Sequence, residues 1–97
     1  MIRHVAVFSW IPEATDEQRE RAATELATLP PLMRGLRSYV FGADVGLAEG
    51  NAEFAIVADF EDADAYFAYR DHPAHVAVAK LAIQPIARQR MTVQFEI

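Results

Sequence analysis

Hydrophobic and polar residues alternate from the start of the chain, which is typical of a β-strand. The segment Ile2–Trp10 is rich in β-branched and aromatic residues and is predicted to be the first strand. Side chains of a strand point alternately to its two faces. One face therefore carries His4, Ala6, Phe8 and Trp10, and the other carries Arg3, Val5, Val7 and Ser9.

After Pro12 the pattern changes to a helical period. Thr15 and Gln18 have the T-x-x-Q spacing of a capping box, which predicts a helix N-terminus at this point. Apolar residues at the spacing i, i+4, i+7 then form one stripe: Ala22, Leu26 and Leu29. Pro30 and Pro31 follow and end the predicted helix.

The rest of the chain predicts three more strands and two more helices. Alternation places the strands at Leu36–Phe41, Glu53–Phe60 and Met91–Ile97, and the segment Gly42–Asn51, with three of the four glycines, is predicted to be a loop. Acidic residues after Phe60 begin a short helix that continues through Tyr69. A longer helix is predicted for Ala74–Gln84, after His72-Pro73 and before Pro85.

This order of elements, β-α-β-β-α-(α)-β, predicts an α+β protein with a ferredoxin-like fold. The four-stranded antiparallel sheet would have its helices on one face, and residues 1–97 would form a single domain. The first and third strands are apolar on both faces, although helices can cover only one. We therefore expect a homodimer in which two open sheet faces pack together. The alternative is a monomer with a poorly covered sheet.

Composition narrows the function. The net charge is −5, and the eight arginines and one lysine are scattered, so no basic stripe for nucleic acid is expected. No cysteine is present, which excludes disulfides, thiolate zinc sites and a cysteine nucleophile. The longest apolar stretches are far shorter than the ~20 residues of a membrane span, so no membrane partner is expected. A cytoplasmic protein is the default expectation.

The three histidines are the first candidates for chemistry, because histidine titrates near neutral pH. His4 lies in the middle of the first strand, while His72 and His75 flank Pro73 at the start of the long helix. Tyr69 precedes His75 by six residues, and the turn at Pro73 could bring the two together. Structural explanations stand beside these: His4 as a hydrogen-bonded core residue, His72 as a helix cap, and His75 bonded to a nearby carbonyl.

Other classes of site have weaker support. His72 and His75 have a spacing that could hold a metal, but Pro73 makes His72 non-helical and no third ligand is evident, so no metal is expected. The glycines of the predicted loop do not match a phosphate-binding G-x-G-x-x-G motif. The serines lack the G-x-S-x-G context of a serine hydrolase.

Three segments of the chain resemble the Dabb family, the stress-responsive dimeric α/β-barrel proteins. They are the opening I-R-H-V, the stretch E-G-N-x-x-x-A-I-V-x-D-F at Glu49–Phe60, and Y-R-D-H-P-A-H-V at Tyr69–Val76, which is the most specific. The similarity extends over essentially the whole chain. It implies a ferredoxin-like fold and a homodimeric barrel in which two sheets pack face to face.

The resemblance also implies a candidate reaction. A minority of the family are polyketide cyclases, which close a linear polyketide by aldol condensation without a cofactor, and their Tyr-His pair corresponds to Tyr69 and His75. The imidazole would remove a proton α to a carbonyl, and the tyrosine hydroxyl would hydrogen-bond the carbonyl oxygen. His4 matches another pocket histidine of those cyclases, whereas Phe54 stands where they have a further one.

We therefore expect a pocket between the sheet and the helices that binds a small, apolar, carbonyl-bearing molecule without a cofactor. Tyr69 and His75 are the candidate catalytic residues. The expected lining residues are His4, Ala6, Phe8, Phe54, Ile56, Leu81 and Ile86. The alternative is a non-catalytic dimeric module, structural or stress-related, whose histidines serve only to hold the fold.

Overall fold

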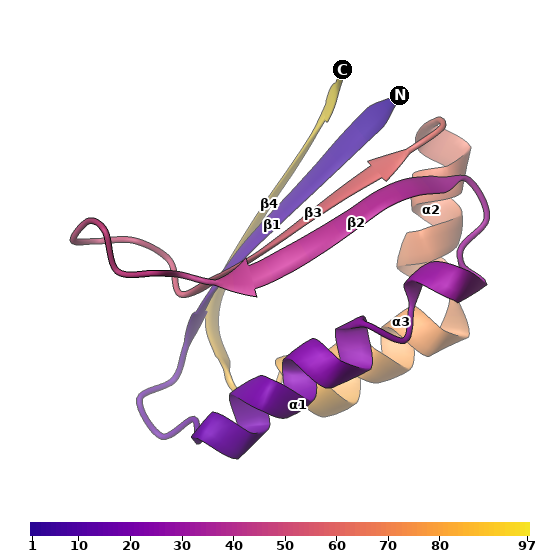
Figure 1. The fold of residues 1–97 in the computed structure, drawn as a ribbon. Helices are drawn as coiled ribbons and strands as arrows, with labels where there is room; N and C mark the ends of the chain where they lie inside the picture. Colours follow the sequence, from indigo (N-terminus) through magenta and orange to yellow (C-terminus); the bar gives the residue numbers. More distant parts are fainter.

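The computed structural model describes residues 1–97 as a four-stranded antiparallel sheet with helices on one face (Figure 1). The strands are β1 (Ile2–Trp10), β2 (Leu36–Ala43), β3 (Phe54–Phe60) and β4 (Ala87–Glu96). The helices are α1 (Asp16–Leu26), α2 (Ala63–Asp71) and α3 (Pro73–Val78), with a 3₁₀ turn η1 (Pro30–Leu32) and a π-helical turn η2 (Ala79–Ile83). The strand order is β2-β3-β1-β4, and the predicted ferredoxin-like fold is confirmed.

The two faces of β1 differ in burial as its alternation predicts. His4, Ala6, Phe8 and Trp10 are buried, whereas the residues between them are only partly covered. The antiparallel register of β1 with β3 adds a second row to the covered face, because directly paired residues share a face. That row consists of Phe54, Ile56, Ala58 and Phe60. The core therefore lies between this face and the helices.

Local signals in the sequence account for the helix ends. The capping box at Thr15 is present: its hydroxyl accepts from the backbone N–H of Gln18, whose side chain accepts from the backbone N–H of Thr15. His72 caps α3, since its Nδ1 accepts a hydrogen bond from the backbone N–H of Ala74 at 3.0 Å. The interpretation of His72 as a helix cap is thus confirmed.

The helix predicted for Ala74–Gln84 is present, but its second half is not α-helical. It changes after Val78 into the π-helical turn, in which the backbone N–H of Gln84 bonds the carbonyl of Ala79 at 2.8 Å, five residues earlier. Pro85 follows directly. A proline ring clashes with the carbonyl four residues before it in a regular α-helix, which accounts for the wider turn at this point.

Two strand boundaries also differ from the prediction. β4 begins at Ala87 rather than Met91, because its register with β1 extends as far as the Trp10–Ala87 pair. β2 continues through Gly42 to Ala43, so the loop is shorter than predicted at its beginning. The earlier start of β4 matters most, because it places additional side chains beside the helices.

The second face of the sheet has no helix on it and is largely apolar (Figure 1). The apolar residues that register places there include Val5, Val7, Val40, Val57, Met91, Val93 and Phe95. We call these residues the open face. Arg3 and Asp59 lie on the same side and form a two-pronged ion pair at 2.7 and 2.9 Å. No helix of the protein is long and apolar enough to span a membrane.

Candidate functional site

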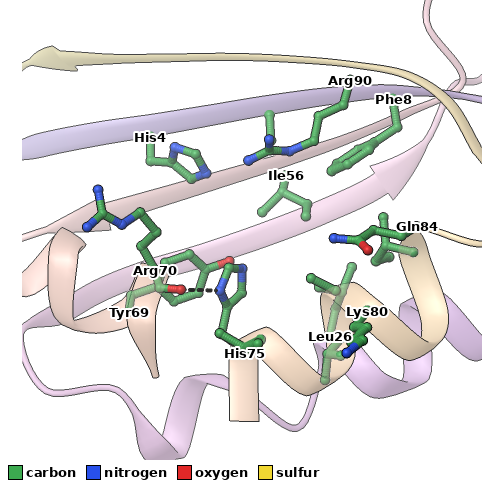
Figure 2. A pocket seen from close by; sticks show the side chains of 15 residues that line it. His4, Phe8, Leu26, Ile56, Tyr69, Arg70, His75, Lys80, Gln84 and Arg90 are labelled. Carbon is green, nitrogen blue, oxygen red and sulfur yellow. Dashed lines mark hydrogen bonds between the residues drawn. The ribbon is translucent and has the colours of Figure 1, made fainter. Parts of the chain in front are cut away.

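A cavity of about 310 Å³ lies between the covered face of the sheet and the helices (Figure 2). This volume is in the range of sites for small molecules. Strands β1 and β3 supply one wall through His4, Ala6, Phe8 and Ile56. The opposite wall is formed by Leu26 of α1, the end of α2 and the segment from α3 to Gln84. Most of the lining is apolar, and its polar groups come from a few histidine, tyrosine, arginine, lysine and glutamine side chains.

The structure brings together six of the nine residues expected at this site. His4, Ala6, Phe8, Ile56, Tyr69 and His75 line the cavity, and the other three lie elsewhere. Phe54 lies at the far end of β3, packed against the rings of Trp10 and Phe41. Leu81 is 65 % exposed on the outer side of the π-helical turn. Ile86 is only 1 % exposed, because the chain after Pro85 carries it into the core.

His75 projects from the first turn of α3 toward the sheet (Figure 2). Its Nδ1 lies 3.0 Å from the backbone carbonyl oxygen of Arg70. A carbonyl can only accept, so Nδ1 carries the proton and Nε2 keeps a free lone pair. Burial lowers the pKa of His75, and the carbonyl of Arg70 opposes this shift. The imidazole is therefore neutral at pH 7 and able to accept a proton.

Tyr69 lies at the end of α2, and its ring packs on His75 with 4.2 Å between the ring centroids. Its hydroxyl forms a 3.0 Å hydrogen bond with the hydroxyl of Tyr39, and the side chain is only 3 % exposed. Burial, followed by the neighbouring Tyr39, raises the pKa of Tyr69 above its ordinary value. The hydroxyl of Tyr69 thus stays protonated and serves as a hydrogen-bonding group rather than as a base.

His4 faces the same cavity from β1. Gln94 of β4 places its amide nitrogen 2.9 Å from Nδ1 of His4. An amide nitrogen donates, so Nδ1 accepts and the proton of His4 lies on Nε2. Burial lowers the pKa of His4 to about 4, and the positive charge of Arg90 contributes to the shift. His4 and His75 are both neutral, but with opposite tautomers: one has a donor Nε2 and the other an acceptor Nε2.

Sequence reasoning missed the tyrosine partner and the polar residues of the cavity. Tyr39 lies on β2, and only the register of β2 with β3 places it on the covered face. Arg90 lies opposite Phe8 in the pairing of β1 with β4 and is one of the lining residues, together with Lys80 and Gln84. Polar residues occupy every second position of the last strand, at Thr92, Gln94 and Glu96. The same pattern continued backward along β4 leads to Arg90, and it is the sequence signal that could have identified this residue.

The sequence profile described as the stress responsive A/B barrel domain, Dabb, matches residues 2–97. No curated protein matches the chain. One similar solved structure is a dimeric ferredoxin-like protein of unknown function from Thermobifida fusca YX, with 45 % identity and a TM-score of 0.93. The alignment covers 99 % of this chain and 90 % of that protein.

Two more distant structures share the fold. One is a Dabb family protein from Mesorhizobium loti, 22 % identical with a TM-score of 0.82, covering 99 % of this chain and 95 % of that one. The other is a hydroxynitrile lyase from Passiflora edulis, 14 % identical with a TM-score of 0.86, covering 99 % and 92 %. The match of the family profile over nearly the whole length shows that this chain belongs to the Dabb stress-responsive A/B barrel family.

Proposed function

We propose that this protein binds a small, mostly apolar, carbonyl-bearing molecule in the cavity and removes a proton α to its carbonyl. The observation that supports the proposal best is the tautomer of His75, whose Nδ1 is bonded to the Arg70 carbonyl and whose Nε2 is left free. General base catalysis needs an unprotonated group whose pKa lies close to the working pH. His75 is unprotonated at pH 7, because burial lowers its pKa, and its free Nε2 can accept a proton.

Two further groups suit the negative charge that would develop on the carbonyl oxygen. His4 has its proton on Nε2, and when Tyr39 donates to Tyr69, the proton of Tyr69 is free for the ligand. Hydrogen-bond donors fixed before the reaction stabilise such a charge without reorganising. The walls around them are apolar, with Phe8 and Ile56 on the sheet side. Proton transfer of this kind needs no cofactor.

Exchange of the α-protons of phenylacetone in D2O, followed by ¹H NMR at pD 7, tests the proposal. We expect the wild-type protein to accelerate the exchange, and His75→Ala to reduce the acceleration about 10²-fold or more, the usual contribution of a general base. His72→Asn is the matched control, because asparagine also caps helices and His72 is not among the lining residues. Exchange at the buffer rate, or an unchanged rate in His75→Ala, would refute the proposal.

The alternative function is a binding module without catalysis. The hydrogen bonds of His4 and His75 favour this alternative. In each ring one nitrogen is bonded to another group of the protein, as expected for a histidine that serves the structure. The NMR experiment separates the two functions. Line broadening of phenylacetone by the protein without any exchange of its α-protons would support the module.

We also infer that two copies of the chain pair through the open face. Its apolar side chains have no cover in one chain: Met91, Val93 and Phe95 are 61 %, 54 % and 45 % exposed. An apolar patch of this kind usually marks an interface between proteins. The similar protein from Thermobifida fusca is described as dimeric, which supports the same assembly here.

A further inference from the structure

The cavity carries unpaired positive charge although the chain is acidic overall, with a net charge of −5. Arg90 and Lys80 line the cavity, and neither forms an ion pair or a side-chain hydrogen bond. No aspartate or glutamate belongs to the lining. Arg70 differs from these two, because Asp71 pairs with its guanidinium at 2.9 and 3.0 Å.

Arg90 reaches into the cavity along the underside of the sheet. Figure 2 shows its guanidinium between His4 and Ile56, with the amide of Gln84 on the other side of the same space. Phe8, its direct partner across β1 and β4, supplies an apolar surface beside it. Burial is the main cause of the lowered pKa of His4 and of His75, and the positive charge of Arg90 lowers both pKa values further.

The polar groups on the sheet side of the cavity are therefore donors. The guanidinium of Arg90 can only donate, and the Nε2 of His4 carries a proton. Such a wall attracts an acceptor, and a guanidinium fits a carboxylate with two parallel hydrogen bonds. The apolar surface of Phe8 and Ile56 beside it suits a hydrocarbon or aromatic body.

We propose that the molecule bound in this cavity is a carboxylate with an apolar body, and that Arg90 selects for its negative charge. The carboxylate lies against the guanidinium, and the apolar body lies against Phe8 and Ile56. This inference rests on the proposed function, because it concerns the same cavity, and it adds the substrate class. The second unpaired cation, Lys80, faces the cavity from the helix side and adds to the attraction.

The test compares a carboxylate with its neutral form, 3-benzoylpropionate and its methyl ester, which share the same aromatic ketone body and differ only at the carboxyl end. Trp10 is the single tryptophan and its ring stacks on Phe8 with 5.8 Å between centroids, so its fluorescence reports binding. At low ionic strength we expect the carboxylate to bind at least about tenfold more tightly than the ester, as charge-assisted hydrogen bonds imply. The preference should narrow in 0.5 M NaCl, because salt screens exposed charges.

Variants of β4 assign the effect to one residue. Arg90→Gln should remove most of the preference and leave only the smaller contribution of Lys80, whereas Arg90→Lys, which keeps the charge but not the two-pronged geometry, should retain more of it. Arg88→Gln is the matched control: it removes the same charge from the same strand, and Arg88 is exposed like Arg90 but lies outside the cavity lining. If Arg90→Gln does not fold, Lys80→Gln provides the second test. It should lower the preference for the carboxylate over the ester, because Lys80 is the other unpaired cation of the lining.

The outcomes separate this inference from the proposed function. Equal affinity for acid and ester in the wild type overturns the inference, while proton exchange in phenylacetone would still support the proposed function. A preference that is undiminished in Arg90→Gln, or that falls equally in Arg88→Gln, also overturns it. If neither ligand binds, the inference fails, and the exchange of phenylacetone alone decides the proposed function.

Discussion

The fold keeps the side chain of His4 neutral. We expect this one residue to make the stability of the protein depend on pH in the acid range. His4 is 4 % exposed, and its bond from Gln94 uses the neutral form of the ring. Burial lowers its pKa to about 4, whereas an unfolded chain would have a value of about 6.5. Between these two values the unfolded state binds more protons than the folded state, so folding becomes less favourable as the pH falls.

We expect the free energy of unfolding to fall by up to about 3 kcal/mol more in the wild type than in His4→Gln between pH 6.5 and pH 4. Urea denaturation at several pH values in this window gives the comparison. Carboxylates titrate in both proteins and cancel in the difference. Parallel stability curves for the two proteins would contradict the assignment of a low pKa to His4.

At the scale of elements, Gly35 determines how closely β2 approaches α2. Its φ of +75° is in the left-handed region, and a Cβ at this position would lie 2.7 Å from the Cβ of Ala65 in α2. Its carbonyl also accepts a 2.8 Å hydrogen bond from the backbone N–H of Glu61. The start of the second strand therefore depends on a residue with no side chain.

Gly35→Ala should destabilise the protein through both backbone strain and this close contact. Gly46 is the matched control, because its φ of +77° is similar but no atom lies within 4 Å of a Cβ placed there. We expect Gly46→Ala to cost about 1 kcal/mol from the backbone alone, and Gly35→Ala at least about 1 kcal/mol more. Thermal or urea unfolding measures the difference, and equal losses in the two variants would show that the contact with Ala65 is unimportant.

The elements also show which features a single sequence can predict. The faces of β1, the capping box at Thr15 and the cap at His72 follow from neighbouring residues, so local patterns were sufficient for them. The cavity depends on contacts between residues far apart in the chain. Arg90 reaches it through its pairing with Phe8, and Tyr69 bonds Tyr39 across thirty positions. Periodicity carries no information about such register.

Two of the three misplaced lining residues show further limits of a prediction from periodicity. Leu81 has the spacing of an inward-facing residue in a regular helix, but the π-helical turn at Ala79–Ile83 changes the spacing and exposes it. Phe54 faces the helices as alternation predicts, yet it lies at the wrong end of the strand for the cavity. Alternation predicts the face of the sheet to which a side chain points, but not whether its position along the strand lies beside the cavity.

At the scale of the whole molecule, the helices cover one side of the sheet and the open face has no cover in a single chain (Figure 1). Val93→Glu would place a charge in the middle of the proposed interface. We expect it to convert the dimer into a monomer, because burying an unpaired carboxylate costs several kcal/mol. Light scattering coupled to size-exclusion chromatography gives the mass of each form.

Leu81→Glu is the matched control for this substitution. Leu81 is also an exposed apolar residue, but it lies on the helix side of the molecule. The variant should remain a dimer with unchanged elution. A monomeric wild type, or a dimer that persists in Val93→Glu, would contradict pairing through the open face.

In the proposed dimer, the Arg3–Asp59 pair restricts how the two sheets can align. Surfaces made of valine side chains match each other almost equally well in several offsets and rotations, so apolar area alone favours association without choosing a geometry. A charged pair is different, because it loses water in any alignment that sets it against the partner's aliphatic side chains. Two-fold symmetry presents this pair twice. The proposed dimer would therefore adopt one alignment because Arg3 and Asp59 make the other alignments unfavourable.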